Sequence, residues 1–219
     1  MENLPLIKFA ELNKGIIIRD SFQDIFLIAD IDGHSELDDQ DVQDHTMPMR
    51  LDALLMVLVL EGSSEIALDY VPYTIGANSF TIIMPTHTIQ LNKVSKGFKG
   101  KLLVISREFL DECNTAKRSP SMANYMQLRK NPCTTFEAQE TELVDNYIEL
   151  LRSKIKNRTH FFQKEVMQNA FVGFLLEIAN IFMGKKDGLL MPALSRKEEL
   201  FEQLSLIHIS EPTRRVVIS

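Results

Sequence analysis

Histidines are the first residues to consider, because imidazole can act both as a metal ligand and as a general base. A metal site on β-strands needs converging ligands, such as His-x-His with a nearby Glu and a later His. Here His34, His45, His87 and His160 each stand alone, with no second histidine at ligand spacing. We therefore expect no metal, no other cofactor and no enzyme activity. The fifth histidine, His208, lies in the C-terminal tail, residues 204–219.

Other chemical motifs are also missing from the sequence. It contains no Gly-x-Ser-x-Gly, no P-loop and no dinucleotide fingerprint, so nucleophilic or nucleotide chemistry is not indicated. Asp30-Ile31-Asp32-Gly33 resembles the start of a calcium loop, but the later ligand positions do not fit, and we interpret it as a turn. The acidic run at 36–44 predicts a solvated loop.

One segment, residues 86–94, has the polar pattern of a small-molecule site. In a strand, successive side chains point to opposite faces, so Thr88, Gln90 and Asn92 share one face, and His87, Ile89 and Leu91 share the other. If the first face points into a barrel, its hydroxyl and amide groups can bind a small polar effector such as a sugar. If it points to water, these residues are ordinary surface. His87, Thr88, Gln90 and Asn92 are the candidate ligand-binding residues.

The elements that must position this segment are short strands, which continue to about residue 105. Turn residues separate them, as at Asp32-Gly33, Gly62 and Gly76-Ala77-Asn78, where Gly and Asn tolerate positive φ. No helix-length crossover lies between the strands. The pattern therefore predicts an antiparallel sandwich or barrel. The expected strands are 15–19, 24–31, 51–61, 65–73, 79–84, 87–94 and 101–105.

After residue 106 the apolar period becomes helical. Residues 106–110 and 122–129 predict short helices, while 140–156 and 160–183 predict two long ones joined by a short link. Long helices with a short link pack antiparallel. The first long helix carries an apolar stripe that either packs on the barrel alone or also meets its copy in a second subunit. This candidate dimerisation stripe consists of Leu143, Tyr147, Leu150, Leu151 and Ile155.

A linker, a further helix start and an unusual tail follow the two long helices. Residues 185–194, with Gly188 and Pro192, predict a linker. Ser195-Arg196-Lys197-Glu198 is a capping box that begins another helix. Residues 204–214 read as the in-frame translation of a transposase-type sequencing adapter. We therefore expect residues 204–219 to be an artefact. The natural part of the given sequence is then expected to run only to about Gln203.

Charge and composition limit the partners of the chain. It has 24 basic and 30 acidic residues, a formal net charge of -6, which disfavours binding of nucleic acid or a membrane surface by the chain as given. Cys113 and Cys133 are too few for a disulfide framework, and we expect free thiols. The N-terminus has neither a basic nor an apolar signal region, so we expect a cytoplasmic protein.

The order of these parts resembles a known family. A strand-rich half with turns at Gly62 and Gly76-Ala77-Asn78, then residues 82–87 and 98–108, precedes an amphipathic helix pair. This arrangement resembles the cupin-like N-terminal domain of AraC-type bacterial transcription regulators, and residues 195–203 look like the first helix of their DNA-binding domain. The likeness covers nearly all of residues 4–203. The individual motifs that support the likeness are turn residues and apolar spacings. The effector-binding residues of the family cannot be matched one by one to positions in this sequence.

The resemblance implies an α+β fold: a cupin-like antiparallel β-barrel of jelly-roll type, followed by an antiparallel amphipathic helix pair. It implies a ligand-sensing part that forms a homodimer and contacts DNA only through a missing helix-turn-helix domain. Two alternatives stay open, namely a small cupin metalloenzyme of isomerase or dioxygenase type and a stand-alone ligand-binding cupin. The expected divisions are barrel 1–106, helical region 107–184, linker 185–194, truncated DNA-binding domain 195–203 and artefact 204–219.

Overall fold

A computed structural model describes residues 6–7, 19–32, 47–85, 87–115 and 131–185 of the chain. Several features expected from the sequence lie outside these residues. They are most of the strand 15–19, His34, His45, the acidic run at 36–44, the helix 122–129, and all positions after 185, with the linker, the helix start at Ser195 and the tail 204–219.

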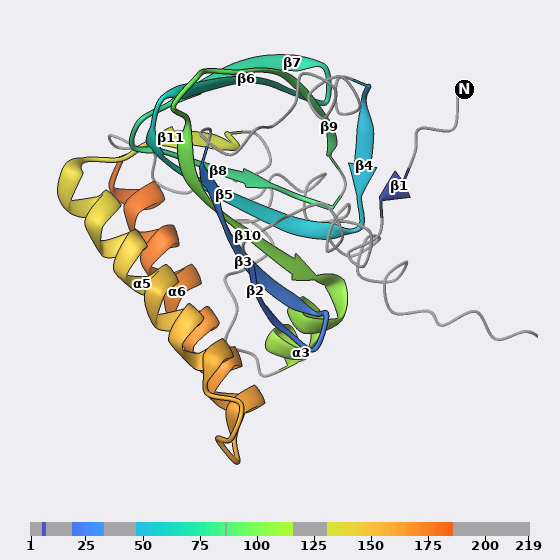
Figure 1. The fold of residues 1–219 in the computed structure, drawn as a ribbon, viewed down its shortest axis with the longest axis vertical. Coiled ribbons are helices and arrows are strands. Elements are labelled where there is room, and N and C mark those ends of the chain that lie inside the picture. Colours follow the sequence, from blue (N-terminus) through green and yellow to red (C-terminus); the bar gives the residue numbers. More distant parts are fainter. Residues whose placement is uncertain (1–5, 8–18, 33–46, 86, 116–130, 186–219) are drawn as a thin grey trace, which may run out of the picture.

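The described strands form two sheets that face each other (Figure 1). One sheet has the order β1-β4-β9-β6-β7 and the other the order β11-β8-β5-β10-β3-β2. The pairings are antiparallel, apart from the parallel pair β1 and β4. The strands are β1 (Leu6–Ile7), β2 (Arg19–Phe22), β3 (Phe26–Asp32), β4 (Met49–Leu51), β5 (Ala53–Glu61), β6 (Ser63–Leu68), β7 (Val71–Gly76), β8 (Ser79–Ile83), β9 (Thr88–Val94), β10 (Lys99–Ser106) and β11 (Cys133–Thr135).

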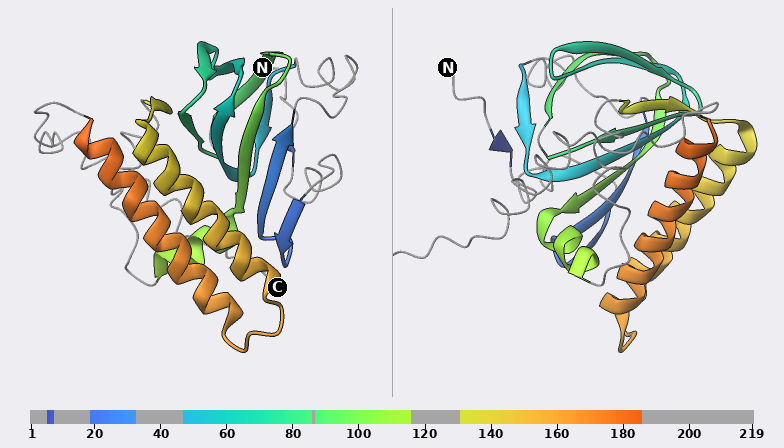
Figure 2. Two further views of the ribbon diagram at one scale, coloured as in Figure 1. Left: turned by 60° about the vertical axis from the view of Figure 1, so that its left-hand side comes forward. Right: turned by 180° about the vertical axis from the view of Figure 1, so that it is seen from behind.

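The helices lie on one side of this double sheet, as Figures 1 and 2 show. They are α3 (Arg107–Thr115), α5 (Ala138–Lys156) and α6 (Gln163–Gly184). The link at 157–162 is too short for any arrangement of α5 and α6 other than an antiparallel pair. The expected α+β class, with mostly antiparallel sheets followed by a helix pair, is confirmed. None of the helices in the described ranges is long and apolar enough to cross a membrane.

Two apolar cores follow from the alternation of side chains along the strands. In β3, Phe26 and Ile28 point to the helices, whereas Leu27 and Ala29 point to the opposite sheet. The first core lies between the six-stranded sheet and the helices, and the second lies between the two sheets. The helices therefore pack on the outside of the barrel wall, and the effector space expected from the sequence corresponds to the second core.

The expected strand 65–73 was wrong, because the chain turns in its middle. Asp69 and Tyr70 both have positive φ, 49° and 67°, as the two central residues of a tight hairpin turn require. The segment therefore becomes two paired strands, β6 and β7. Neither residue is a glycine, so the turn has little signature in the sequence. Asp52 likewise separates β4 from the long strand that was expected at 51–61.

The expected helical region 107–184 also contributes a strand. β11 lies inside this range and pairs with β8 at the edge of the six-stranded sheet. Phe136, directly after β11, stacks on Phe80 with ring centroids 5.2 Å apart. The helices and the sheet thus share one apolar core instead of forming separate units.

Gly62 allows the close approach of two turns. Its φ is +77°, and a Cβ atom there would lie 2.7 Å from the Ser95 hydroxyl oxygen and 2.8 Å from the Phe98 Cα. A side chain at this position would therefore need both an unfavourable backbone conformation and displacement of the neighbouring backbone.

Candidate functional site

The candidate residues on β9 do not line the space between the sheets together. Ile89 and Leu91 pack against the inner core, so the apolar face of β9 is the one that points inward. Gln90 is half-buried and Asn92 is exposed. The pairing of β9 with β6 shifts next to Asn92, because Glu65 pairs with Lys93 and Ile66 pairs with Leu91. The bulge leaves Asn92 outside the regular register.

His87 and Thr88 lie together at the hairpin turn between β6 and β7. The imidazole of His87 is buried, and its Nδ1 accepts a hydrogen bond of 3.2 Å from the Met84 N–H. Its Nε2 lies 4.0 Å from the Asp69 carboxylate. The same carboxylate accepts a 2.8 Å bond from the Thr88 N–H, and the Asp69 N–H donates to the Thr88 carbonyl. This set anchors the turn to the start of β9.

Polar groups inside the barrel come from residues that the sequence reasoning missed. We call Tyr73, Thr81 and Cys133 the inner polar group. Thr81 is fully buried and its hydroxyl donates to the Cys133 sulfur at 3.6 Å. Tyr73 and Cys133 both pack against the core between the sheets. A phenol, a hydroxyl and a thiol in an apolar space can donate to, or accept from, one polar group of a small molecule.

The electrostatics of this group keep it neutral. Burial raises the pKa of Tyr73, and the nearby Cys133 and Asp69 raise it further. Burial also raises the pKa of Cys133, although the Thr81 hydrogen bond opposes this in part. A neutral phenol and thiol suit hydrogen bonding better than nucleophilic attack, which needs a thiolate. Alternation along residues 79–84 puts Thr81 on the face of the strand opposite to Phe80 and Ile82. Because β11 was not predicted, the contact between Thr81 and Cys133 could not be anticipated from the sequence.

The candidate dimerisation stripe on α5 divides into two faces. Leu151 and Ile155 are buried in the core against the sheet, together with Val144 and Ile148. Leu143 and Leu150 are 38% and 41% exposed. Tyr147 lies between these faces, half-buried, with its ring 6.2 Å from that of Phe174 on α6.

An ion-pair network joins the buried side of α5 to the sheet. The Arg152 guanidinium donates to both oxygens of Asp30, at 2.8 and 2.6 Å, and to Asp20 at 3.2 Å. Lys101 on β10 pairs with Asp145 and, at 2.7 Å, with Glu149. Burial lowers the pKa of Lys101, but its hydrogen bonds to these two carboxylates raise it more, so its pKa lies above the usual value.

The network was not visible in the sequence. There, Arg152 matches a cation placed near a helix C-terminus, where it complements the helix dipole. In the structure it is only 7% exposed and belongs to the helix–sheet interface. Asp20 and Asp30 are more than 100 positions away in the chain. The network fixes α5 against β2 and β3 in a single geometry, because a planar guanidinium and a carboxylate bond in a paired, directional way.

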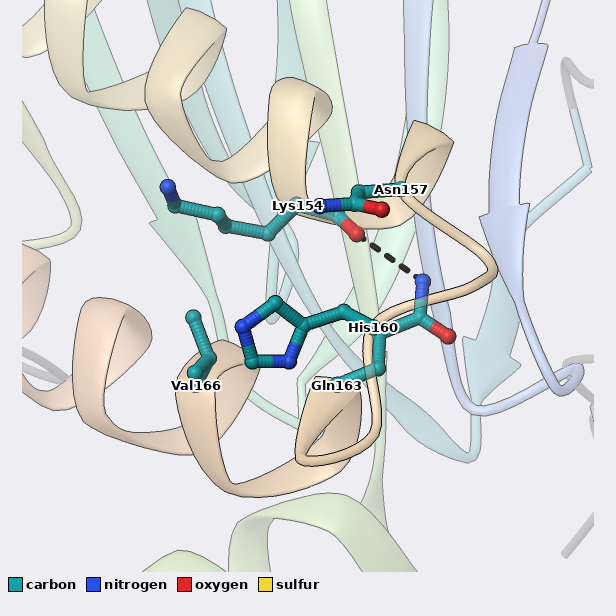
Figure 3. Close-up of a pocket in the computed structure, with 5 residues that line it drawn as sticks. All are labelled: Lys154, Asn157, His160, Gln163 and Val166. Carbon is teal, nitrogen blue, oxygen red and sulfur yellow. Dashed lines mark hydrogen bonds between the residues drawn. The ribbon is translucent and has the colours of Figure 1, made fainter.

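A small hollow lies where α5 and α6 meet, and Figure 3 shows its lining. It is formed by Lys154, Asn157, His160, Gln163 and Val166 and holds about 40 Å³. The Gln163 amide donates to the carbonyls of Lys154 and Ile155 and so provides hydrogen-bond partners for two carbonyls in the last turn of α5. This volume suits a water or two and not an organic effector.

Metal-ligating residues are not gathered in the described ranges. No three of His, Cys, Asp and Glu lie close enough there to hold an ion. His160 is exposed at the link between α5 and α6, and His87 belongs to the turn described above.

No protein-family model and no curated protein matches the chain. Among solved structures it is similar to a ligand-free ToxT variant from Vibrio cholerae, with 15% identity and a TM-score of 0.43, over 87% of this chain and 67% of that one. It is similar to ToxT bound to an unsaturated fatty acid, with 12% identity and a TM-score of 0.40, over 83% of this chain and 63% of that one.

A third similar structure is the AraC-like transcriptional activator CuxR, with 14% identity and a TM-score of 0.37, over 85% of this chain and 74% of that one. The chain thus spans 67% and 63% of the length of the two ToxT chains. Identities and TM-scores of this size assign no family to the chain.

Proposed function

We propose that this chain is the ligand-sensing and dimerisation part of an AraC-type transcription regulator. The observation that carries the proposal is the order and packing of its parts. An antiparallel barrel with a polar group inside is followed by a helix pair that packs on the barrel wall and keeps leucines exposed. The barrel lies within residues 1–106 plus β11, and the helices lie within residues 107–184.

The effector in this proposal is a small molecule that binds between the two sheets. The core between the sheets is mainly aliphatic, and Tyr73, Thr81 and Cys133 are the polar residues beside it. We therefore favour a mainly apolar molecule with one hydrogen-bonding group over the sugar-like effector that the β9 pattern suggested. His87 and Thr88 act indirectly, because they hold the turn that carries Asp69.

Ligand binding can be tested by thermal shift with a panel of fatty acids, aromatic acids and sugars. A ligand that binds only the folded state raises the melting temperature according to its affinity. We expect Tyr73→Phe and Thr81→Val to reduce the shift given by an active compound. Thr74→Val is the matched control, because Thr74 is exposed on the opposite side of β7. Equal losses in all three variants would contradict a site at the inner polar group.

Dimerisation in this proposal uses the outer face of α5. Leu143, Tyr147 and Leu150 follow each other at spacings of four and three residues, which is the pattern of a helix–helix seam. Leu176, exposed on the neighbouring α6, adds apolar surface to the same helix pair. A two-fold axis would bring this face against its own copy.

Light scattering coupled to size exclusion tests the dimer. We expect a dimer for the unaltered chain and a monomer for Leu143→Ser combined with Leu150→Ser. Val71→Ser is the matched control, because Val71 is an exposed apolar residue on the barrel. A monomeric unaltered chain, or a double variant that stays dimeric, would reject this face.

DNA recognition in the proposal belongs to a helix-turn-helix module that starts at Ser195, outside the described residues. The capping box at 195–198 supports a helix start at that point. Sequencing the genomic locus tests this part. Two helix-turn-helix motifs after residue 203 are the expected result, and a stop codon soon after Gln203 would reject the regulator.

A further inference from the structure

The link between α5 and α6 ends in two exposed aromatic side chains. Phe161 is 91% exposed and Phe162 is 57% exposed, and their rings lie edge to face with centroids 4.9 Å apart. Every other phenylalanine in the described part of the chain is buried. Two adjacent exposed phenylalanines form an apolar patch that the described part of the chain leaves uncovered.

Basic residues lie close to this aromatic pair in the sequence. Between Glu149 and Glu165 the chain has five Lys or Arg residues and no Asp or Glu. Arg152 belongs to the helix–sheet network, and Lys156 lies 3.5 Å from Asp20. Lys164 pairs with Glu112 at 2.6 Å.

Two further cations, Lys154 and Arg158, have no ion pair with an acidic residue in the described ranges. They lie on either side of the point where α5 ends. Two cations without an acidic partner in the described ranges therefore lie at one end of the helix pair.

The position of the link makes it accessible. In Figures 1 and 2 the link is the far end of the helix pair and projects beyond both sheets. Backbone hydrogen bonds from Arg158 to Lys156, from His160 to Asn157 and from Gln163 to His160 shape the turn. The Phe162 N–H also donates to the His160 imidazole at 3.1 Å. The aromatic pair is thus presented by a hydrogen-bonded turn.

We propose that this link, residues 157–162, is a docking tip for an anionic phospholipid surface. Phenylalanine side chains enter the boundary between headgroups and acyl chains, while Lys and Arg attract anionic headgroups. Because charges farther than about 8 Å are screened at physiological salt, the cations at the tip act independently of the net charge of -6. The prediction of no membrane binding from the net charge therefore does not apply to this tip.

Other partners fit the tip less well. A stable protein interface buries about 800 Å² on each side and about 20 residues, more than a six-residue projecting turn can supply. A nucleic acid duplex would pair with the cations but leave both phenylalanine rings without apolar contact. Single-stranded nucleic acid can stack on aromatic rings, and it is therefore the competing outcome of the test.

The absence of tryptophan from the sequence allows a direct probe. Phe161→Trp places the sole tryptophan at the tip, where its emission reports insertion into lipid. With vesicles that contain about 30% phosphatidylserine in phosphatidylcholine, we expect a blue shift and quenching by brominated acyl chains. Pure phosphatidylcholine should give a much smaller change. Tyr70→Trp, at the exposed turn of the barrel, is the control and should not shift.

Binding variants separate the two contributions. Replacing both Phe161 and Phe162 by Ser should lower vesicle binding about tenfold or more, without a change in melting temperature, because neither ring is buried. Lys154→Gln with Arg158→Gln should lower it about 10- to 30-fold at low salt, since each cation near an anionic surface contributes about a fivefold effect. Lys93→Gln with Lys96→Gln, on the barrel, should change binding by less than about twofold.

Three results would overturn the proposal. They are no binding of the unaltered chain to anionic vesicles, equal binding by the double serine variant, and tip-dependent binding to a single-stranded oligonucleotide in the absence of a vesicle response. The outcome does not depend on the proposed function, because it involves neither the inner polar group nor the outer face of α5.

Discussion

Arg152 offers the most informative test of how the helices are fixed to the barrel. We predict that Arg152→Met, which keeps the length of the aliphatic chain, lowers the free energy of unfolding by about 2–3 kcal/mol. Removing one member of a buried ion pair costs about 3–5 kcal/mol, because the remaining charges lose their partner. Here Asp30 and Glu149 are 42% and 48% exposed and can regain water, which reduces the cost.

The measurement is chemical denaturation followed by circular dichroism at several salt concentrations. For a chain of this size the predicted loss lowers the melting temperature by roughly 5–10 °C. A double-mutant cycle with Asp30→Asn should give a coupling of about 1–2 kcal/mol, since two short charge-assisted hydrogen bonds join the pair.

The control is Lys93→Met, which removes an exposed pair with Glu65 at 3.9 Å and should cost less than about 0.5 kcal/mol. If Arg152→Met cost no more than this control, or if the coupling with Asp30 were near zero, the network would not hold α5 on the sheet. Loss of stability with an unchanged oligomeric state would show in addition that the network acts within one subunit.

Three further predictions follow from backbone geometry and titration. Gly62→Ala should destabilise the chain by about 1–3 kcal/mol in urea unfolding, because its φ is positive and the neighbouring turn leaves no room; a neutral effect would contradict this. Burial, with a smaller contribution from Glu112, raises the pKa of Cys113 to about 12, so alkylation at pH 8 should label it only upon unfolding; fast labelling of the native chain would refute this. Burial raises the pKa of Glu140, but the hydrogen bonds from Lys185 and from the Glu137 N–H lower it more, so its pKa lies below the usual value. Its contribution to stability is therefore present above the unfolded pKa and is lost as pH falls through the folded pKa. Glu140→Gln should cost about 0.5–1 kcal/mol at pH 7 and almost nothing once the pH is below the folded pKa, and a pH-independent cost would exclude the charge as the cause.

The periodicity of the sequence predicted most of the strands and both long helices. The change from alternation to a helical period at about residue 106 marks the start of α3. Errors occurred where turns lack glycine. The hairpin at Asp69 and Tyr70 has positive φ at both residues but little sequence signature, and β11 is too short to show a period.

The candidate sites were harder to predict. Alternation along β9 correctly separated Gln90 and Asn92 from Ile89 and Leu91, but it does not say which face points inward. Two facing sheets decide this, because they bury whichever face adds to the apolar core between them. The same limit applies to α5, where Leu150 and Leu151 are adjacent in sequence, yet one is exposed and the other is in the core.

The sequence by itself determined the class of the fold, the order of strands before helices and the amphipathic character of α5 and α6. These properties depend on local spacing and turn chemistry, which are written along the chain. Only the tertiary structure decided that Thr81 meets Cys133, that Arg152 faces Asp30, and that Phe161 and Phe162 stay outside the core. Such contacts join residues distant in sequence, and their partners are set by how the sheets and helices pack.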